Sequence, residues 1–198
     1  MRDGAARLTA LAKEISSCSR CPDLAESRAR ALCGHGSERA RIMVVAPFPS
    51  QEDEHESQTG AGSSLFSWLS GYLPTLADER RGSVYVTALV KCVPRTGDSV
   101  RGPMEYEQTN CFPFLSAEMS VITPHFVLPV GRDTCAFLLR RFFGRAGESV
   151  LPPAIRVIES PSFGVIPVAG PAELEEMAKR ERTRYIDQLR GLTARIGL

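Results

Sequence analysis

The sequence has almost no net charge and no long apolar run. Its 24 Lys and Arg residues and 23 Asp and Glu residues leave a formal net charge of +1 over 198 residues. A nucleic-acid partner therefore cannot be inferred from overall basicity and would require a local basic surface. No apolar run approaches the roughly 18 residues of a membrane-spanning helix, and the first residues lack the apolar core of a signal peptide. We expect a cytoplasmic monomer without membrane contact.

The chain has six cysteines, which in a reducing compartment indicate metal ligands or small core residues rather than disulfides. Cys18 and Cys21 form a C-x-x-C pair, Cys92 follows the apolar run 85–90, and Cys111 opens the run Cys111–Leu115. Two thiolates from one loop and two from separate elements can form a four-thiolate site for zinc or an iron–sulfur cluster. Such a site would tie the N-terminal segment to the middle of the chain.

Apolar runs of strand length alternate with segments of helical periodicity. Strands are predicted at 41–46, 84–90, 125–131 and 154–159, and helices near 8–15, 65–73, 105–121, 133–142 and 171–196. This alternation predicts one α/β domain over residues 1–198, a three-layer α/β/α sandwich with a mostly parallel four-stranded central sheet. Ligand sites in such folds lie beyond the carboxyl ends of the strands. The rule selects four segments: 46–62, 91–95, 131–133 and 159–164.

Several longer motifs occur in order along the chain. They are Cys18-x-x-Cys21, Ala46-Pro47, Val86-Thr87-x-x-Val90-Lys91-Cys92-x-Pro94, Glu107-x-x-x-Cys111-x-Pro113-Phe114 and Gly131-Arg132. From about residue 10 to 165 the chain resembles the iron–sulfur uracil-DNA glycosylases. The resemblance implies the glycosylase fold and a 4Fe-4S cluster on Cys18, Cys21, Cys92 and Cys111, with zinc as the alternative. Cys33 and Cys135 fall outside this set and are expected in the core.

The catalytic motifs of that family are altered here. Its Gly-Glu-Ala-Pro-Gly motif is Val44-Val45-Ala46-Pro47-Phe48, without the glutamate. Ser57 stands where an aromatic residue stacks on the flipped uracil, and Ala88 replaces the asparagine that pairs with the uracil edge. The histidine of the family's His-Pro-Ser motif matches Ser160, although Pro161 and Ser162 remain. A lost polar partner costs roughly 1–3 kcal/mol, so we expect plain uracil to bind poorly.

These changes predict a pocket for a larger base. By the resemblance, Ala46, Pro47, Phe48, Ser57 and Ala88 would line it, and the loss of side-chain volume at residues 57 and 88 would admit a bulky modified base. Glucosylated hydroxymethylcytosine of phage DNA is one example, and excising it would serve antiviral defence. The alternatives are a repair glycosylase for uracil or deaminated bases, and an inactive DNA-binding or partner-binding module.

Hydrolysis of the N-glycosidic bond of a flipped base requires a carboxylate near the sugar. Asp53 and Glu52 are the candidates, and His55 is a candidate for binding phosphate or polarising the leaving base. The other interpretation of these three residues is a solvated acidic loop with an exposed histidine. Contacts to the DNA backbone are expected from Lys91, Arg132 and the loop Ser160-Pro161-Ser162.

Overall fold

The computed structural model describes residues 3–55, 63–72, 84–144 and 155–196. Its helices are α1 (Asp3–Ser16), α2 (Pro22–Ser27), α3 (Gln51–His55), α4 (Ser63–Tyr72), α5 (Glu105–Ile122), α6 (Arg132–Phe143), α7 (Pro171–Glu176) and α8 (Lys179–Arg195). Its strands are β1 (His35–Gly36), β2 (Ile42–Ala46), β3 (Val84–Ala88), β4 (Arg95–Thr96), β5 (Ser99–Val100), β6 (Phe126–Pro129), β7 (Ile158–Glu159) and β8 (Gly164–Val165). None of the helices in these ranges is long and apolar enough to cross a membrane.

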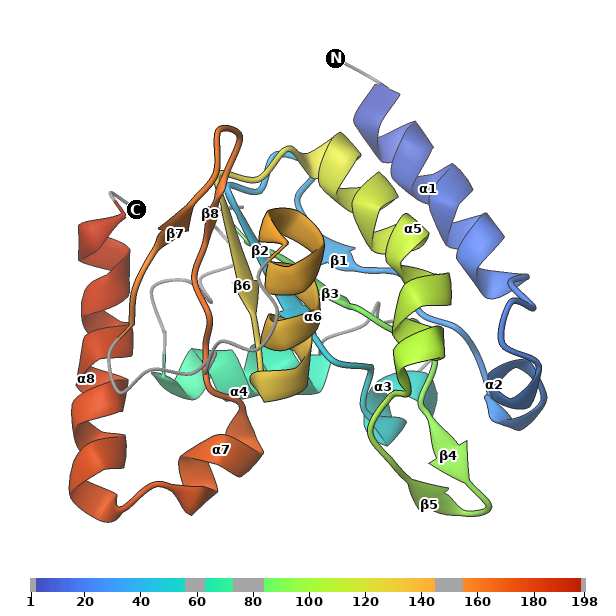
Figure 1. The fold of residues 1–198 in the computed structure, drawn as a ribbon. Helices are drawn as coiled ribbons and strands as arrows, with labels where there is room; N and C mark the ends of the chain where they lie inside the picture. The colour runs from blue at the N-terminus through green and yellow to red at the C-terminus, as the bar shows by residue number, and fades with distance from the viewer. Residues whose placement is uncertain (1–2, 56–62, 73–83, 145–154, 197–198) are drawn as a thin grey trace.

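Within the described residues, the central sheet has six strands in the order β1-β3-β2-β6-β8-β7. The four inner strands are parallel, and the short edge strands β1 and β7 are antiparallel to their neighbours. All five residues of β2 are buried, as expected for a strand covered on both faces. Figure 1 shows α3, α4 and α7 gathered at the end of the sheet to which the inner strands point. The predicted mostly parallel sheet is confirmed, with two additional edge strands.

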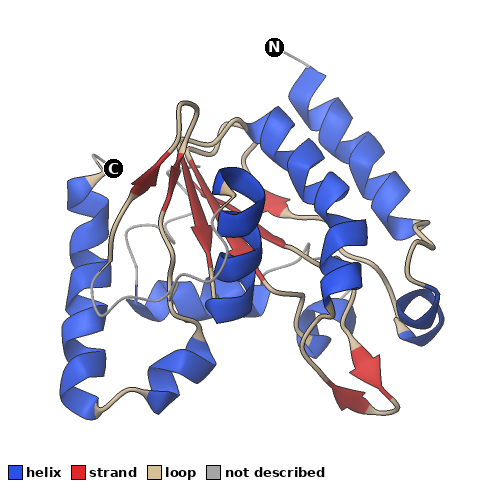
Figure 2. Ribbon diagram, viewed as in Figure 1, coloured by secondary structure: helices blue, strands red, loops and turns tan. Residues whose placement is uncertain are grey.

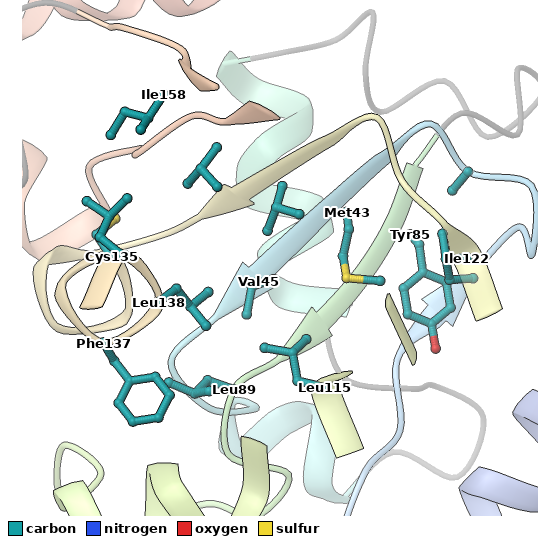
Figure 3. Close-up of a cluster of buried hydrophobic side chains, with 14 residues drawn as sticks. Met43, Val45, Tyr85, Leu89, Leu115, Ile122, Cys135, Phe137, Leu138 and Ile158 are labelled. Carbon is teal, nitrogen blue, oxygen red and sulfur yellow. The ribbon is translucent and has the colours of Figure 1, made fainter. Parts of the chain in front are cut away.

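Helices cover both faces of the sheet (Figure 2). Successive strand side chains point to opposite faces, so Ile42 and Val44 join one core cluster and Met43 and Val45 the other. The first cluster is completed by side chains of α4, α7 and α8. The second, drawn in Figure 3, is completed by α5 and α6. These three layers confirm the predicted α/β/α sandwich.

The predicted fourth parallel strand at 154–159 is wrong. Residues 158–159 form the antiparallel edge strand β7, and the fourth parallel strand is β8. The turn between them is closed by Ser160, whose hydroxyl donates to the Phe163 carbonyl oxygen at 2.7 Å. Backbone pairing with β6 continues beyond β8, because the Val168 N–H donates to the Pro129 carbonyl oxygen at 3.0 Å. The parallel segment therefore runs past Pro167, which itself has no N–H to donate.

Two helix predictions also differ from the structure. No helix was predicted between the strand at 41–46 and the helix near 65–73, but this segment contains the short helix α3. The single final helix expected from Pro171 is two helices, α7 and α8, separated by Ala178 and by Met177, whose backbone is extended. The break allows Met177 to pack against the core cluster on the α8 face.

Candidate functional site

A pocket lies where β2, β3 and β6 end. Ala46 and Ala88 are the last residues of β2 and β3 and are paired in register, and both line the pocket beside Val130. Its volume is about 320 Å³, within the range of about 300–1,000 Å³ found for small-molecule sites. The other lining residues are Pro47, Phe48, Pro49, Ser50, Asp53, Ser64, Leu65, Trp68 and Pro171. The structure thus brings the predicted pocket residues at 46–48 and 88 together with Asp53.

Asp53 is the buried carboxylate of this pocket, with 1% of its surface exposed. At the start of α3 it forms a reciprocal cap with Ser50, because the Asp53 N–H donates to Ser50 Oγ at 3.0 Å and the Ser50 N–H donates to Asp53 Oδ2 at 3.1 Å. Ser64, on α4, donates its N–H to Oδ1 at 3.2 Å and its hydroxyl to Oδ2 at 3.4 Å. Donors at the starts of α3 and α4 therefore fix this carboxylate at the pocket wall.

The other residues predicted near Asp53 lie elsewhere. Glu52 and His55 are exposed on α3 and do not line the pocket. Ser57 lies outside the described residues. Arg132 is exposed at the start of α6, two residues after the pocket residue Val130. Of the three predicted catalytic residues, the structure places only Asp53 at the pocket.

Glu54 is a buried acid that sequence reasoning missed. It is 0% exposed, accepts the Ala29 N–H at 3.1 Å and forms an ion pair with Arg95 on β4. The hydrogen bond that Arg95 donates to the Glu54 carboxylate raises the pKa of the Arg95 guanidinium, against the opposing effect of burial. Glu54 thus connects α3 to the segment after α2 and to the β4–β5 hairpin. These partners are 25 and 41 positions away, so no local pattern could have identified them.

The four cysteines of the predicted cluster line one cavity, which is separate from the pocket that contains Asp53. Cys18 and Cys21 approach it from the turn between α1 and α2, Cys92 from beyond β3, and Cys111 from α5. The same thiols belong to one apolar cluster with Ile15, Leu24 and Phe114. In the described ranges, no three His, Cys, Asp or Glu side chains are arranged to hold a metal ion. What the structure gives is four thiols around a common space.

Three of these sulfurs accept N–H hydrogen bonds. Arg28 Nη1 donates to Cys92 Sγ at 3.3 Å, the Lys91 N–H to Cys111 Sγ at 3.2 Å, and Asn110 Nδ2 to Cys21 Sγ at 3.7 Å. Burial raises the pKa of Cys111 to about 12 and also raises the pKa of Cys21 and Cys92. The N–H donors act against burial, because a hydrogen bond to sulfur lowers the pKa of the thiol and favours the thiolate form that binds metals. The donor set therefore fits a metal cluster held by four cysteines.

The model of the uracil DNA glycosylase superfamily matches residues 33–190. The chain belongs to this superfamily. It is 29% identical over 136 residues to a type-4 uracil-DNA glycosylase of Saccharolobus solfataricus, covering 68% of this chain and 60% of that protein. The type-4 enzyme of Sulfurisphaera tokodaii is 29% identical over 144 residues, which cover 72% of this chain and 60% of that protein. The matched region thus spans less than two thirds of the length of these relatives.

The loop Ser160-Pro161-Ser162, which was predicted to contact DNA, does not line the pocket. Because β7 is antiparallel to β8, the loop lies at the opposite end of the sheet, where Figure 1 shows the β7–β8 turn. The segment that does follow a parallel strand into the pocket region leads from β8 to Pro171, which lines the pocket. Pro171 therefore lies at the pocket end of the sheet, where the Ser160 loop was expected.

Glu173 occupies the space beside Gly170. Its Oε2 accepts the Gly170 N–H at 2.9 Å and its Oε1 accepts the Arg132 N–H at 2.7 Å. A Cβ atom added at Gly170 would lie 2.9 Å from Glu173 Oε2, a distance that requires a shift. A side chain at residue 170 thus competes with the contact that joins the starts of α6 and α7.

Lys91 is buried and does not lie at the surface, where the predicted contact to the DNA backbone would require it. It is 1% exposed, and its Nζ lies 2.6 Å from Glu118 Oε2 and 2.6 Å from Thr87 Oγ1. Glu118 is also fully buried and accepts the Gly34 N–H at 2.8 Å. Lys91 therefore forms a buried ion pair between the end of β3 and α5, in place of the predicted phosphate contact.

Proposed function

We propose that this protein is a DNA glycosylase that flips a base out of the duplex and hydrolyses its N-glycosidic bond. We further propose that the base is a bulky modified one rather than plain uracil. The single observation that carries the proposal is the buried carboxylate of Asp53 beside a pocket floor of two small residues, Ala46 and Ala88. Membership of the superfamily supports the reaction class, and the small floor residues support a larger substrate.

The pocket has a simple division of roles. The flipped base would enter between the strand ends and α4, where apolar side chains line most of the wall. As the bond breaks, positive charge develops on the sugar, and a fixed carboxylate stabilises such charge in a site that excludes water. Asp53 is suited to this role because the donors of Ser50 and Ser64 hold it in place.

A catalytically inactive DNA-binding module on the same fold is the second candidate. It is favoured by Val45 and Ala88, which stand where the family has its glutamate and asparagine, and by the lack of a histidine among the described lining residues. Asp53 also has a structural role as the cap of α3. Under this interpretation the protein binds modified DNA without releasing a base.

A base-release assay on matched duplexes tests the proposal. The duplexes carry uracil, hypoxanthine or glucosylated hydroxymethylcytosine at one position of the same sequence, and abasic sites are counted. We expect abasic sites with the glucosylated base and little or none with uracil. Ala88→Asn, which adds volume and an amide to the pocket floor, should reduce release of the glucosylated base and increase release of uracil. Uracil as the preferred base would overturn the substrate proposal, and binding without release of any base would favour the inactive module.

The biological role follows from the substrate. Removal of a base that occurs only in phage DNA would leave abasic sites in the invading genome and spare the host, so we propose a role in antiviral defence. We also propose that the protein acts in the cytoplasm as a monomer. Among the predicted DNA contacts, exposed Arg132 remains a candidate for a backbone phosphate.

We also propose that Cys18, Cys21, Cys92 and Cys111 hold a 4Fe-4S cluster, supported by their shared cavity and their N–H donors. A cluster bound by four protein thiolates would tie the N-terminal segment to β3 and α5 without taking part in hydrolysis. Protein purified without oxygen should be brown and contain iron and acid-labile sulfide in equal amounts. Cys111→Ser should lose both and unfold at a lower temperature, whereas Cys33→Ser, outside the set, should keep them. One zinc per chain and no sulfide would contradict the proposal.

A further inference from the structure

Trp68 is the only tryptophan of the chain, and it lines the pocket. It lies on α4 four residues after Ser64, whose N–H and hydroxyl donate to Asp53. Residues four apart share one face of a helix, so the face of α4 that binds the carboxylate also brings Trp68 to the pocket. Trp68 is half-buried and packs against the core cluster on the α8 face, which limits the positions that its ring can adopt.

Polar side chains occupy only one part of the pocket. Ser50 and Ser64 are each hydrogen-bonded to Asp53, and apart from the indole N–H of Trp68 the other described lining side chains are apolar. The described side chains of the lining thus present mainly apolar surface to a ligand, and none of them carries a side-chain amide or an imidazole. These side chains can therefore recognise a ligand mainly by its faces and its volume.

We infer that Trp68 is the residue on which the flipped base stacks in the proposed glycosylase activity, on which this inference rests. Flipped bases are commonly held between aromatic or apolar side chains, and Phe48 is the second aromatic residue of this pocket. Stacking on an indole depends on the ring face of the base and tolerates different edges. The site therefore selects a planar heterocycle by its stacked area, and its substituents by the open floor at Ala46 and Ala88.

The fluorescence of the wild-type protein tests this inference directly, because Trp68 is the only source of tryptophan emission. The same three modified duplexes and an unmodified one are prepared with a 2′-fluorinated sugar at the test position, which slows base loss. Binding is followed independently by the anisotropy of a labelled strand. We expect saturable quenching by the duplex that carries the glucosylated base and little quenching by the unmodified duplex at equal occupancy.

Substitution of Trp68 separates stacking from general packing. Trp68→Leu should weaken binding of the glucosylated duplex by roughly 10- to 100-fold, as expected for the loss of one stacked base. Trp68→Phe should recover most of that loss. Phe142→Leu, a matched aromatic change near the end of α6 and away from the pocket, should leave binding unchanged. Circular dichroism and the unfolding temperature of each variant show whether the fold is kept.

The outcomes distinguish this inference from the proposed activity. Wild-type affinity in folded Trp68→Leu, or tight binding without a change in emission, would overturn the stacking role even if the protein excises a base. Base-specific quenching by a protein that releases no base would support the stacking role and contradict catalysis. Failure of all modified duplexes to bind more tightly than the unmodified one would overturn both.

Discussion

Asp53→Asn should lower the rate of base excision by roughly 100- to 1,000-fold, the usual effect of removing one group that stabilises charge in a transition state. The substitution removes the negative charge and keeps the size of the side chain. DNA affinity should change little, because the base is held by apolar side chains. Single-turnover kinetics with enzyme in excess over the labelled duplex measure the chemical step without product release.

The same substitution should also cost some stability, which the design must separate from catalysis. Both oxygens of Asp53 accept hydrogen bonds, Oδ1 from Ser64 and Oδ2 from Ser50, so the amide of asparagine would place a donor against a donor. The cost is about 1–3 kcal/mol, and assays should be run well below the unfolding temperature of the variant. Glu52→Gln removes the same charge from an exposed neighbour and should keep the wild-type rate. If folded Asp53→Asn keeps a rate within tenfold of the wild type, the carboxylate serves only to cap α3.

The parts of the fold that could be predicted are those specified by neighbouring residues. The runs that became β2, β3 and β6 are apolar along most of their length because both faces are covered. The fourth parallel strand was missed because Gly164 and Pro167 interrupt its apolar run, although Val165, Ile166 and Val168 are fully or almost fully buried. Because the strand at 158–159 was expected to be parallel but is antiparallel, the loop Ser160-Pro161-Ser162 was predicted at the wrong end of the sheet. A loop after an antiparallel strand lies at the opposite end of the sheet, which is why the Ser160 loop does not reach the pocket.

The parts of the site that could not be predicted depend on partners far apart in the sequence. Cys92 and Cys111 stand within longer motifs that the sequence shows, and the structure places both on one cavity. Glu54 and Asp53 are adjacent acids on α3, yet one pairs with Arg95 and the other faces the pocket. The local sequence does not distinguish these two acids, because both lie in the same acidic run. Only the packing of α3 against the hairpin and α4 separates a structural acid from a candidate catalytic one.

Lys91 provides a direct test of such a distant contact. Lys91→Met should lower the free energy of unfolding by about 3–5 kcal/mol, because it leaves the fully buried Glu118 carboxylate without its cation. For a chain of this size that loss corresponds to a fall of roughly 10 °C in the unfolding temperature. The double variant Lys91→Met with Glu118→Gln removes both charges and should recover part of the loss. Chemical denaturation of the three proteins measures the coupling.

Arg132→Ala is the matched control, since Arg132 is an exposed cation at the pocket end of the sheet. It should change the free energy of unfolding by less than about 0.5 kcal/mol. If Arg132 contacts one phosphate, the slope of log affinity against log salt should fall in magnitude by about 0.9. Lys91→Met should leave that slope unchanged, because a buried lysine paired with Glu118 releases no counterion on DNA binding. The opposite pattern, in which Lys91→Met keeps wild-type stability and reduces the slope, would return Lys91 to the DNA-binding surface.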